Sequence, residues 1–321
     1  MKDILTKYNN TDDLLEIESW AGAATKISGY IGMIAELTKK QDYKPDVIVG
    51  VSSGSIAGLM RITTMISPST IVPLVKLAKG FSLDDIFNKK PVNENNRLTL
   101  GAIARGVKGA LSLGEHIQLR DTLKQFYTKE IWQKYVEGDY PDLIICSTNI
   151  DTGDYLMYNA KRLSYEDTLL HILSSSAIPG LMKPLSMHKS LIMDGGIRYS
   201  NAGWYVIYKM INSGYKIHSH VSLYSQPQDI SKEIDSPLEL KKTRFFKGIF
   251  SIIGRSISIM MFQNTKFCEF TEQQLAEKES YDLYQCFLPN ILNSSLSVDK
   301  KELEKLYYAG MKSVAKLDKK Y

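Results

Sequence analysis

The sequence predicts an α/β fold in which a mainly parallel central sheet is flanked by helices in a single domain. Strand and helix patterns alternate from the start of the chain, and the strands at 14–19 and 47–49 are each followed by a helix. Such alternation builds crossover units, which place their strands in parallel. The chain has 321 residues, of which 44% are hydrophobic, so it is long enough to bury one large core.

The first two units follow the same order. The strand at 14–19 leads through a turn into a helix over 28–39, whose apolar residues recur at helical spacing. The β-branched run 47–49 breaks on two glycines and continues as a small-residue helix over 53–64. Two such units in succession predict the parallel core of the sheet.

The rest of the chain continues this mixture. A mostly helical stretch, 68–136, is followed by a helix over 169–176, which Pro179 and Gly180 end, and by a helix over 204–212. The further strands are predicted at 142–148, 155–158, 190–193 and 218–224.

Domain organisation is predicted to be simple, because the sequence contains no internal repeat and no clean linker. We expect one domain over 1–321, with its core at about 14–225 and a mostly helical C-terminal part at about 236–321. A helix over 299–317 is predicted to close the chain.

Composition excludes several function classes. The formal net charge is only +5 and the cations are scattered, which argues against a nucleic-acid partner. The three cysteines lack the CxxC spacing of a metal or redox site. The N-terminus has no apolar signal core, and the most apolar later run, 248–262, is too short to span a bilayer. The predicted location is the cytoplasm.

A nucleophile motif lies between the second strand and its helix. Residues 50–54, Gly-Val-Ser-Ser-Gly, match the G-x-S-x-G elbow, in which a sharp turn projects the serine hydroxyl clear of the sheet. Gly50 and Gly54 lack the Cβ atoms that would clash where strand and helix cross. Helix amides near Ser55 carry partial positive charge at the place where an oxyanion would form. The motif predicts Ser52 as a catalytic nucleophile.

Histidine is the usual base for such a serine. His218 and His220 would suit an ordinary α/β-hydrolase, with Asp194 as the acid. That fold needs several strands before the elbow, and only one precedes it here. Both histidines also fall in the predicted strand 218–224, where we expect them on the surface.

Asp194 is the other candidate base. It stands at the end of the strand 190–193 and is followed by Gly195 and Gly196, which leave its carboxylate unobstructed. A partly buried carboxylate in reach of a serine hydroxyl can serve as its base. The alternative is that Asp-Gly-Gly is only a tight turn. The residues by themselves leave both interpretations open.

Several segments, taken in order, resemble the patatin-like phospholipase family. The run 50–54 resembles its nucleophile elbow, and Asp194-Gly195-Gly196 resembles its catalytic "DGG". The serine-rich stretch 174–180, with the later Pro184, resembles its "ASxAxPxxFxP" stretch. Residues 146–153 are similar to the strand and turn that precede that stretch in the family, and residues 302–310 are similar to the family's closing helix. The similarity covers about residues 15 to 315.

The resemblance implies a Ser–Asp dyad without histidine, formed by Ser52 and Asp194. In that mechanism the aspartate takes the serine proton, the serine attacks an ester carbonyl, and water then hydrolyses the acyl-serine. The implied substrate is a phospholipid or another acyl-ester lipid, and no cofactor is needed.

The same resemblance places the oxyanion hole at Gly22, Ala23, Ala24 and Thr25. The family has a "GGGxxG" turn there, whereas residues 22–27 of this chain read Gly-Ala-Ala-Thr-Lys-Ile. Backbone amides bind the oxyanion, so alanine can serve at negative φ but is strained at positive φ. The family's proline soon after "DGG" is also missing here.

Three functions are therefore open. The first is a lipid acyl hydrolase of the phospholipase A type. The second is an acyltransferase on the same dyad, in which an alcohol replaces water. The third is a non-enzymatic, lipid-binding relative with a weakened oxyanion turn.

One further segment bears on contact with membranes. Leu238–Asn264 combines a cluster of cations at its start with an apolar stripe at helical spacing. Basic amphipathic helices of this kind can lie in a membrane interface, which would give a peripheral, transient membrane contact. The alternative is a helix that faces the core and whose cations are solvated.

Overall fold

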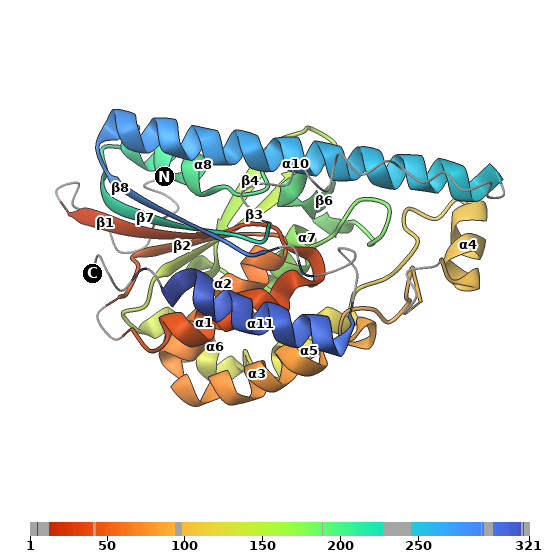
Figure 1. Cartoon of the computed structure of the whole chain (residues 1–321), viewed down its shortest axis with the longest axis horizontal. Coiled ribbons are helices and arrows are strands. Elements are labelled where there is room, and N and C mark those ends of the chain that lie inside the picture. Colours follow the sequence, from red (N-terminus) through yellow and green to blue (C-terminus); the bar gives the residue numbers. More distant parts are fainter. Residues whose placement is uncertain are drawn as a thin grey trace.

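An eight-stranded sheet forms the centre of the molecule, with helices on both of its faces (Figure 1). The computed structural model describes residues 5, 13–40, 43–93, 98–187, 189–226, 245–289, 291, 298–315 and 317; for 245–261 it describes the helix but not the side chains. The strands are β1 (Leu14–Trp20), β2 (Val47–Val51), β3 (Asp142–Asn149), β4 (Tyr155–Asn159), β5 (Leu185–Met187), β6 (Ser190–Asp194), β7 (Lys216–Tyr224) and β8 (Asp282–Phe287). This architecture confirms the predicted α/β class.

The helices form two layers and one outlying element (Figure 1). One face of the sheet is covered by α1 (Ile27–Leu37), α2 (Ser53–Ile66), α3 (Ile71–Gly80), α5 (Gln118–Lys124), α6 (Lys129–Glu137), α7 (Tyr165–Ser175) and α11 (Lys300–Ala315). The other face is covered by α8 (Gly203–Ile211) and the long α10 (Phe245–Glu279). The short helix α4 (Leu100–Val107) lies at one end of the molecule.

The strand order is β5-β6-β3-β2-β1-β7-β8, with β4 paired to β3 outside this path. Five strands, from β8 to β3, are parallel, and the short strands beyond β3 are antiparallel. The register aligns Val51 with Cys146, and the antiparallel strand β6 aligns Asp194 with Ser147. Ser52, which follows β2, and Asp194, the last residue of β6, therefore lie close together near the carboxyl end of β3.

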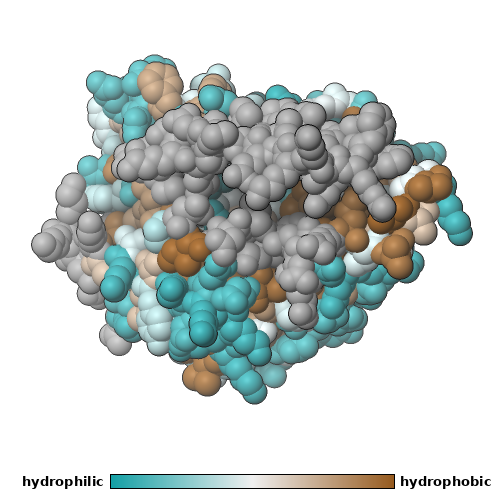
Figure 2. Space-filling model, turned by 45° about the vertical axis from the view of Figure 1, so that its right-hand side comes forward, coloured by the Kyte–Doolittle hydropathy of each residue, from teal (hydrophilic) through white to brown (hydrophobic). Residues whose placement is uncertain are grey.

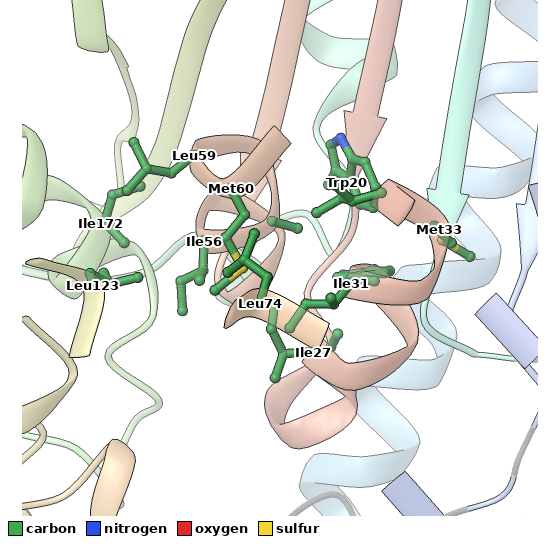
Figure 3. Packing of buried hydrophobic residues seen from close by; sticks show 14 of the residues in the cluster. Trp20, Ile27, Ile31, Met33, Ile56, Leu59, Met60, Leu74, Leu123 and Ile172 are labelled. Carbon is green, nitrogen blue, oxygen red and sulfur yellow. The ribbon is translucent and has the colours of Figure 1, made fainter. Parts of the chain in front are cut away.

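Two apolar layers hold the sheet between its helices. Alternate residues of one strand point to opposite faces, so Ile48 lies in the larger cluster and its neighbours Val47 and Val49 in the smaller one. In the larger cluster, α1, α2 and α3 contribute facing side chains, among them Ile31 and Leu74 (Figure 3). Each fully buried aliphatic side chain of this kind stabilises the fold by about 1.5–3 kcal/mol relative to exposure.

Two strands were missed by the sequence analysis. The segment 282–287, predicted as part of a largely helical region, is β8, which pairs in parallel with β7. The three-residue strand β5 pairs with β6 at the opposite edge. Both are edge strands with half-exposed side chains, so neither has the continuous apolar run that identified the inner strands. The C-terminal part of the chain thus adds a strand to the core sheet.

The expected surface position of the histidines is right for one and wrong for the other. His218 is exposed, whereas His220 is buried against α8, where a Cβ atom on Gly203 would lie only 2.6 Å from the ring Nε2. The Nε2 atom of His220 lies 2.7 Å from the hydroxyl of Ser19. Burial lowers the pKa of His220 to about 3, so its ring is neutral at physiological pH.

The membrane prediction for Leu238–Asn264 falls largely outside the described residues. Residues 227–244 are not described, and of 245–261 only the helical backbone of α10 is. Among the helices that the structure does describe, none combines the length and the apolar character required to cross a bilayer.

Candidate active site

Ser52 sits at a strained turn between β2 and α2. Its backbone has φ 57° and ψ −130°, a conformation that residues with a side chain rarely adopt. Such a residue costs on the order of 1–3 kcal/mol and persists only where its surroundings enforce it. The turn is the strand-to-helix bend that the G-x-S-x-G pattern requires.

The two glycines of the motif allow the backbone to pass very close to its neighbours. A Cβ atom on Gly54 would lie 2.1 Å from the carbonyl oxygen of Trp20, and one on Gly50 would lie 2.4 Å from the Cα of Ser55. Both distances are far shorter than any real carbon contact, so no other residue fits at either position.

A hydrogen bond from a distant helix fixes the backbone of the nucleophile. The amide of Ser52 donates to Ser175 Oγ at 3.0 Å, and Ser175 Oγ in turn donates to the carbonyl of Cys146 at 2.6 Å. Ser175 lies in the serine-rich stretch that the sequence analysis singled out, but its contact with Ser52 could not be read from that motif. It connects the elbow to β3 through the end of α7.

Asp194 meets the hydroxyl of Ser52 directly. Ser52 Oγ donates to Asp194 Oδ2 at 2.6 Å, and the amide of Gly196 donates to Asp194 Oδ1 at 2.7 Å. The carboxyl group is only 6% exposed. Burial raises the pKa of Asp194 to about 6, while the hydrogen bonds from Ser52 and Gly196 act in the opposite direction. A carboxylate with that pKa can accept a proton near neutral pH.

The two glycines after Asp194 differ in how strictly they are required. A Cβ atom on Gly195 would lie 2.5 Å from the carbonyl oxygen of Cys146, so glycine is required there by close approach to β3. A Cβ atom on Gly196 would meet Asp194 Oδ1 at 3.0 Å, a tight contact that would disturb the carboxylate. Both positions hold the carboxyl group beside Ser52.

The predicted oxyanion turn lies next to Ser52, but two of its four amides are already bonded. Gly22 is adjacent, since a Cβ there would be 3.3 Å from the Cβ of Ser52. Its amide donates to the carbonyl of Ser200 at 2.8 Å, and the amide of Ala23 donates to Ser53 Oγ at 2.6 Å. Neither amide is free to bind an oxyanion in this arrangement.

Two other amides near Ser52 are free. The amide of Ala24 and that of Ser53, the first residue of α2, donate no hydrogen bond to any described residue. Ala24, Thr25 and Ser53 line the same pocket as Ser52. The predicted set of oxyanion donors is therefore reduced to the amides at the end of the turn. The amide of Ser53, at the start of α2, is added to that set.

Ala24 has a positive φ of 47°, whereas Ala23 has φ −137°. The loss of the family's glycines therefore strains one of the two positions and leaves the other relaxed. The turn is held in place by its carbonyls: Ala21 accepts a hydrogen bond from the hydroxyl of Tyr30, and Gly22 accepts one from Ser225.

An apolar pocket opens beside the hydroxyl of Ser52. Ser52, Ile56 and Met60 follow one another at intervals of four residues, so they form one wall along α2. The other walls come from α3, α5 and the loop after α7, and include Leu77, Phe81, Ile86, Leu119, Leu123, Ile178 and Met182. The pocket suits a hydrocarbon chain.

Asn264 of α10 is a residue that the sequence analysis missed. Its side-chain oxygen accepts from the amide of Ser200 at 2.8 Å, and its side-chain nitrogen donates to the carbonyls of Arg198 and Gly196 at 2.8 and 3.4 Å. It therefore spans the loop that follows Asp194, where the family's proline is missing. No motif in the sequence marks it.

The remaining candidates lie outside this arrangement. No histidine hydrogen-bonds to Ser52 or Asp194 among the described residues, and His220 is engaged with Ser19. Across the same residues, no group of three or more His, Cys, Asp or Glu side chains could hold a metal ion.

Comparisons with known proteins give one family. The family model for patatin-like phospholipases matches residues 20–206, a stretch that includes Ser52 and Asp194. Among solved structures, VipD from Legionella pneumophila matches with 12% sequence identity and a TM-score of 0.39. The alignment covers 94% of this chain and 66% of that chain, so this chain spans less than two thirds of the length of VipD. No curated protein matches the sequence.

The strain at Ala24 leads to a stability prediction. Ala24→Gly should raise the melting temperature, because it removes about 1–2 kcal/mol of left-handed backbone strain and adds only about 0.5–1 kcal/mol of unfolded-chain entropy. Ala23→Gly is the matched control and should lower it, because the φ of Ala23 is already negative. Thermal unfolding followed by circular dichroism measures both. Equal destabilisation by the two substitutions would show that Ala24 is not strained.

Proposed function

This chain belongs to the patatin-like phospholipase family, and we propose that it is a phospholipase A-type acyl hydrolase that uses Ser52 and Asp194 as a dyad. Membership of the family supports lipid acyl hydrolysis in general. The observation that carries the finer proposal is the 2.6 Å hydrogen bond from Ser52 Oγ to the buried Asp194 carboxylate, at the edge of an apolar pocket.

In the proposed reaction Asp194 acts first as a base. It takes the proton of Ser52 while Oγ attacks the ester carbonyl, and a tetrahedral oxyanion forms. When this intermediate collapses, the bond to the alcohol oxygen breaks, and the alcohol receives the proton from Asp194. Asp194 then takes a proton from water, which attacks the acyl-serine, so that the fatty acid leaves and Ser52 regains its proton.

We propose the amides of Ala24 and Ser53 as the oxyanion donors. Neither amide donates a hydrogen bond within the part of the chain that the structure describes, and both residues line the pocket beside Ser52. The residue after the nucleophile supplies a donor in elbow enzymes generally, and here it also begins α2, whose N-terminus carries partial positive charge. The second donor comes from the turn after β1, as in that scheme.

The apolar pocket is the proposed site of the acyl chain. Ester chemistry at Ser52 places the carbonyl carbon at the start of the wall formed by Ile56 and Met60, so the chain would run along α2. The polar residues Ser52 and Ser53 lie at the start of α2, and most of the other lining residues are aliphatic or aromatic. This distribution fits an acyl ester, with its polar end at the serine and its hydrocarbon in the pocket.

One observation favours a second candidate function. Two of the four amides of the predicted oxyanion turn are bonded internally, which is the condition expected of a non-enzymatic, lipid-binding relative. An assay of a medium-chain fluorogenic ester with the purified protein distinguishes the two functions. Turnover supports the hydrolase; binding of fatty acid without turnover supports the alternative.

Removing either member of the dyad should abolish hydrolysis. Ser52→Ala and Asp194→Asn should each lower kcat/KM by at least about 1,000-fold, and the double variant should be little worse, because the two residues act as one unit. His220→Gln, whose ring contacts Ser19 instead, is the control and should keep most of the activity. Loss of activity in a folded His220→Gln protein would contradict the dyad.

The pH dependence of the wild type should follow Asp194. The base must be a carboxylate to accept the serine proton, so kcat/KM should be constant at high pH and fall tenfold per unit below a pKa of about 6. An ordinary aspartate, with a pKa of 3.8, would leave the rate unchanged down to about pH 4. A profile of the ester assay between pH 4 and 8 therefore measures whether burial has raised this pKa, and a flat profile would contradict it.

Asn264 is proposed as a positioning residue for the loop after Asp194. Asn264→Ala removes three hydrogen bonds to that loop and should lower kcat by about tenfold or more while KM changes little, because the acyl pocket is untouched. Asn264→Asp keeps the acceptor for the Ser200 amide and should lose less activity. The exposed neighbour Gln263→Ala is the matched control. Equal kcat values for all three variants would show that the loop keeps its shape without Asn264.

A further inference from the structure

Helix α4 presents its apolar side to solvent. Leu100, Ile103 and Val107 recur at the spacing that forms one stripe on a helix, and they are 86%, 47% and 84% exposed. Leu111, just beyond the helix, is 66% exposed. A surface helix of a globular protein normally turns such a stripe to the core. The orientation of α4 is the reverse.

The polar side of α4 is what faces the protein. Arg105 donates from Nε to the carbonyl of Leu113 at 2.8 Å and from its terminal nitrogen to the carbonyl of Lys90 at 3.2 Å. Ala102, on the same side, is fully buried. The side chain of Thr99 caps the helix at the amide of Ala102 and donates to the carbonyl of Lys90. These contacts fix the rotation of the helix, so its apolar stripe cannot turn inward.

The exposed stripe continues towards the proposed active site. Leu111 and Ile117 line a second, wider hollow together with Leu173, Pro184, Leu185 and Leu191. The amide of Leu113 donates to the carbonyl of Gly180 at 2.8 Å, and this loop continues to Met182 in the wall of the acyl pocket. Apolar surface is exposed on the side of the molecule that carries α4 (Figure 2).

Charge on this segment favours an anionic surface. Residues 98–114 contain two cations, Arg105 and Lys108, and no aspartate or glutamate. Lys108 is exposed and forms no ion pair with any described residue. An aliphatic stripe flanked by a free cation, without acidic residues, is the composition of helices that lie in the interface of anionic bilayers.

We propose that Leu100, Ile103, Val107 and Leu111 form a membrane-docking surface, which inserts into the interface of an anionic lipid bilayer and brings the pocket of Ser52 to its lipid substrate. The proposal rests on the proposed function for the identity of that substrate. It concerns α4, a different element from the segment Leu238–Asn264 considered above. A stripe of four aliphatic side chains gives weak, reversible binding, as a peripheral enzyme requires for turnover.

Vesicle binding tests this surface. The triple variant Leu100→Ser/Val107→Ser/Leu111→Ser should bind vesicles of phosphatidylcholine and phosphatidylglycerol at least about tenfold more weakly than the wild type, because three aliphatic side chains lose their burial. The matched control is Leu14→Ser/Val72→Ser, which removes aliphatic side chains that are 60% and 70% exposed elsewhere, and should bind like the wild type. Lys108→Glu should weaken binding to anionic vesicles and leave binding to neutral ones unchanged.

Three outcomes would overturn the proposal. In the first, the wild type does not sediment with vesicles. In the second, the folded triple variant binds them as well as the wild type does. In the third, the triple variant turns a wild-type dimer into a monomer without any effect on vesicle binding, which would make the surface an interface between two copies of the chain.

Hydrolysis of a soluble short-chain ester separates this proposal from the proposed function. The triple variant should hydrolyse it at the wild-type rate, because none of the three residues lines the acyl pocket. If the wild type hydrolyses no ester, but the triple variant still loses vesicle binding, docking is supported and the enzymatic function fails. If the soluble ester is hydrolysed, but the wild type and the triple variant bind vesicles equally well, the enzymatic function is supported and docking through this surface fails.

Discussion

The site depends on holding Ser52 in a backbone conformation that it would not adopt by itself. Gly54 lets α2 start against the carbonyl of Trp20 in β1, and Ser175 at the end of α7 accepts the hydrogen bond of the Ser52 amide. The strain of on the order of 1–3 kcal/mol is therefore offset by contacts between segments far apart in the chain. The serine hydroxyl points at Asp194 only when the whole sheet is assembled.

The burial of Asp194 has a cost in stability. Burial raises its pKa from 3.8 to about 6, so the folded protein holds a proton there more tightly than the unfolded chain does. The stability that this proton contributes is fully present below about pH 4 and is lost as the pH rises through about 6. The proposed base is thus ionised, as the proposed mechanism requires, under the conditions in which Asp194 stabilises the fold least. The hydrogen bonds from Ser52 and Gly196 limit this penalty.

Features with one local cause could be predicted from the sequence, and features that depend on a neighbour could not. The elbow at Ser52 and the strand end at Asp194 require particular residues in sequence, so the pattern reveals them. Burial of His220 depends on its packing against Gly203 of α8, which the pattern of the strand β7 does not reveal. Asn264 bonds to Ser200 across 64 positions, and no local rule relates the two. The oxyanion turn lies between these cases: its place was predictable, but the internal bonds of its amides were not.

The orientation of helix α4 also could not be predicted from its own sequence. Its periodicity reveals an apolar stripe, but only the contacts of Arg105 and Ala102 decide that the stripe faces solvent. A rotation of the helix that buried the stripe would leave the guanidinium of Arg105 without its carbonyl partners. The helix therefore keeps the rotation that preserves these hydrogen bonds and exposes the stripe. A leucine side chain that stays exposed to water contributes no hydrophobic stabilisation to the fold. The amide of Leu113, in the loop after α4, donates to the carbonyl of Gly180, which lies between Ile178 and Met182 in the wall of the pocket of Ser52. This loop therefore connects the exposed stripe to that pocket.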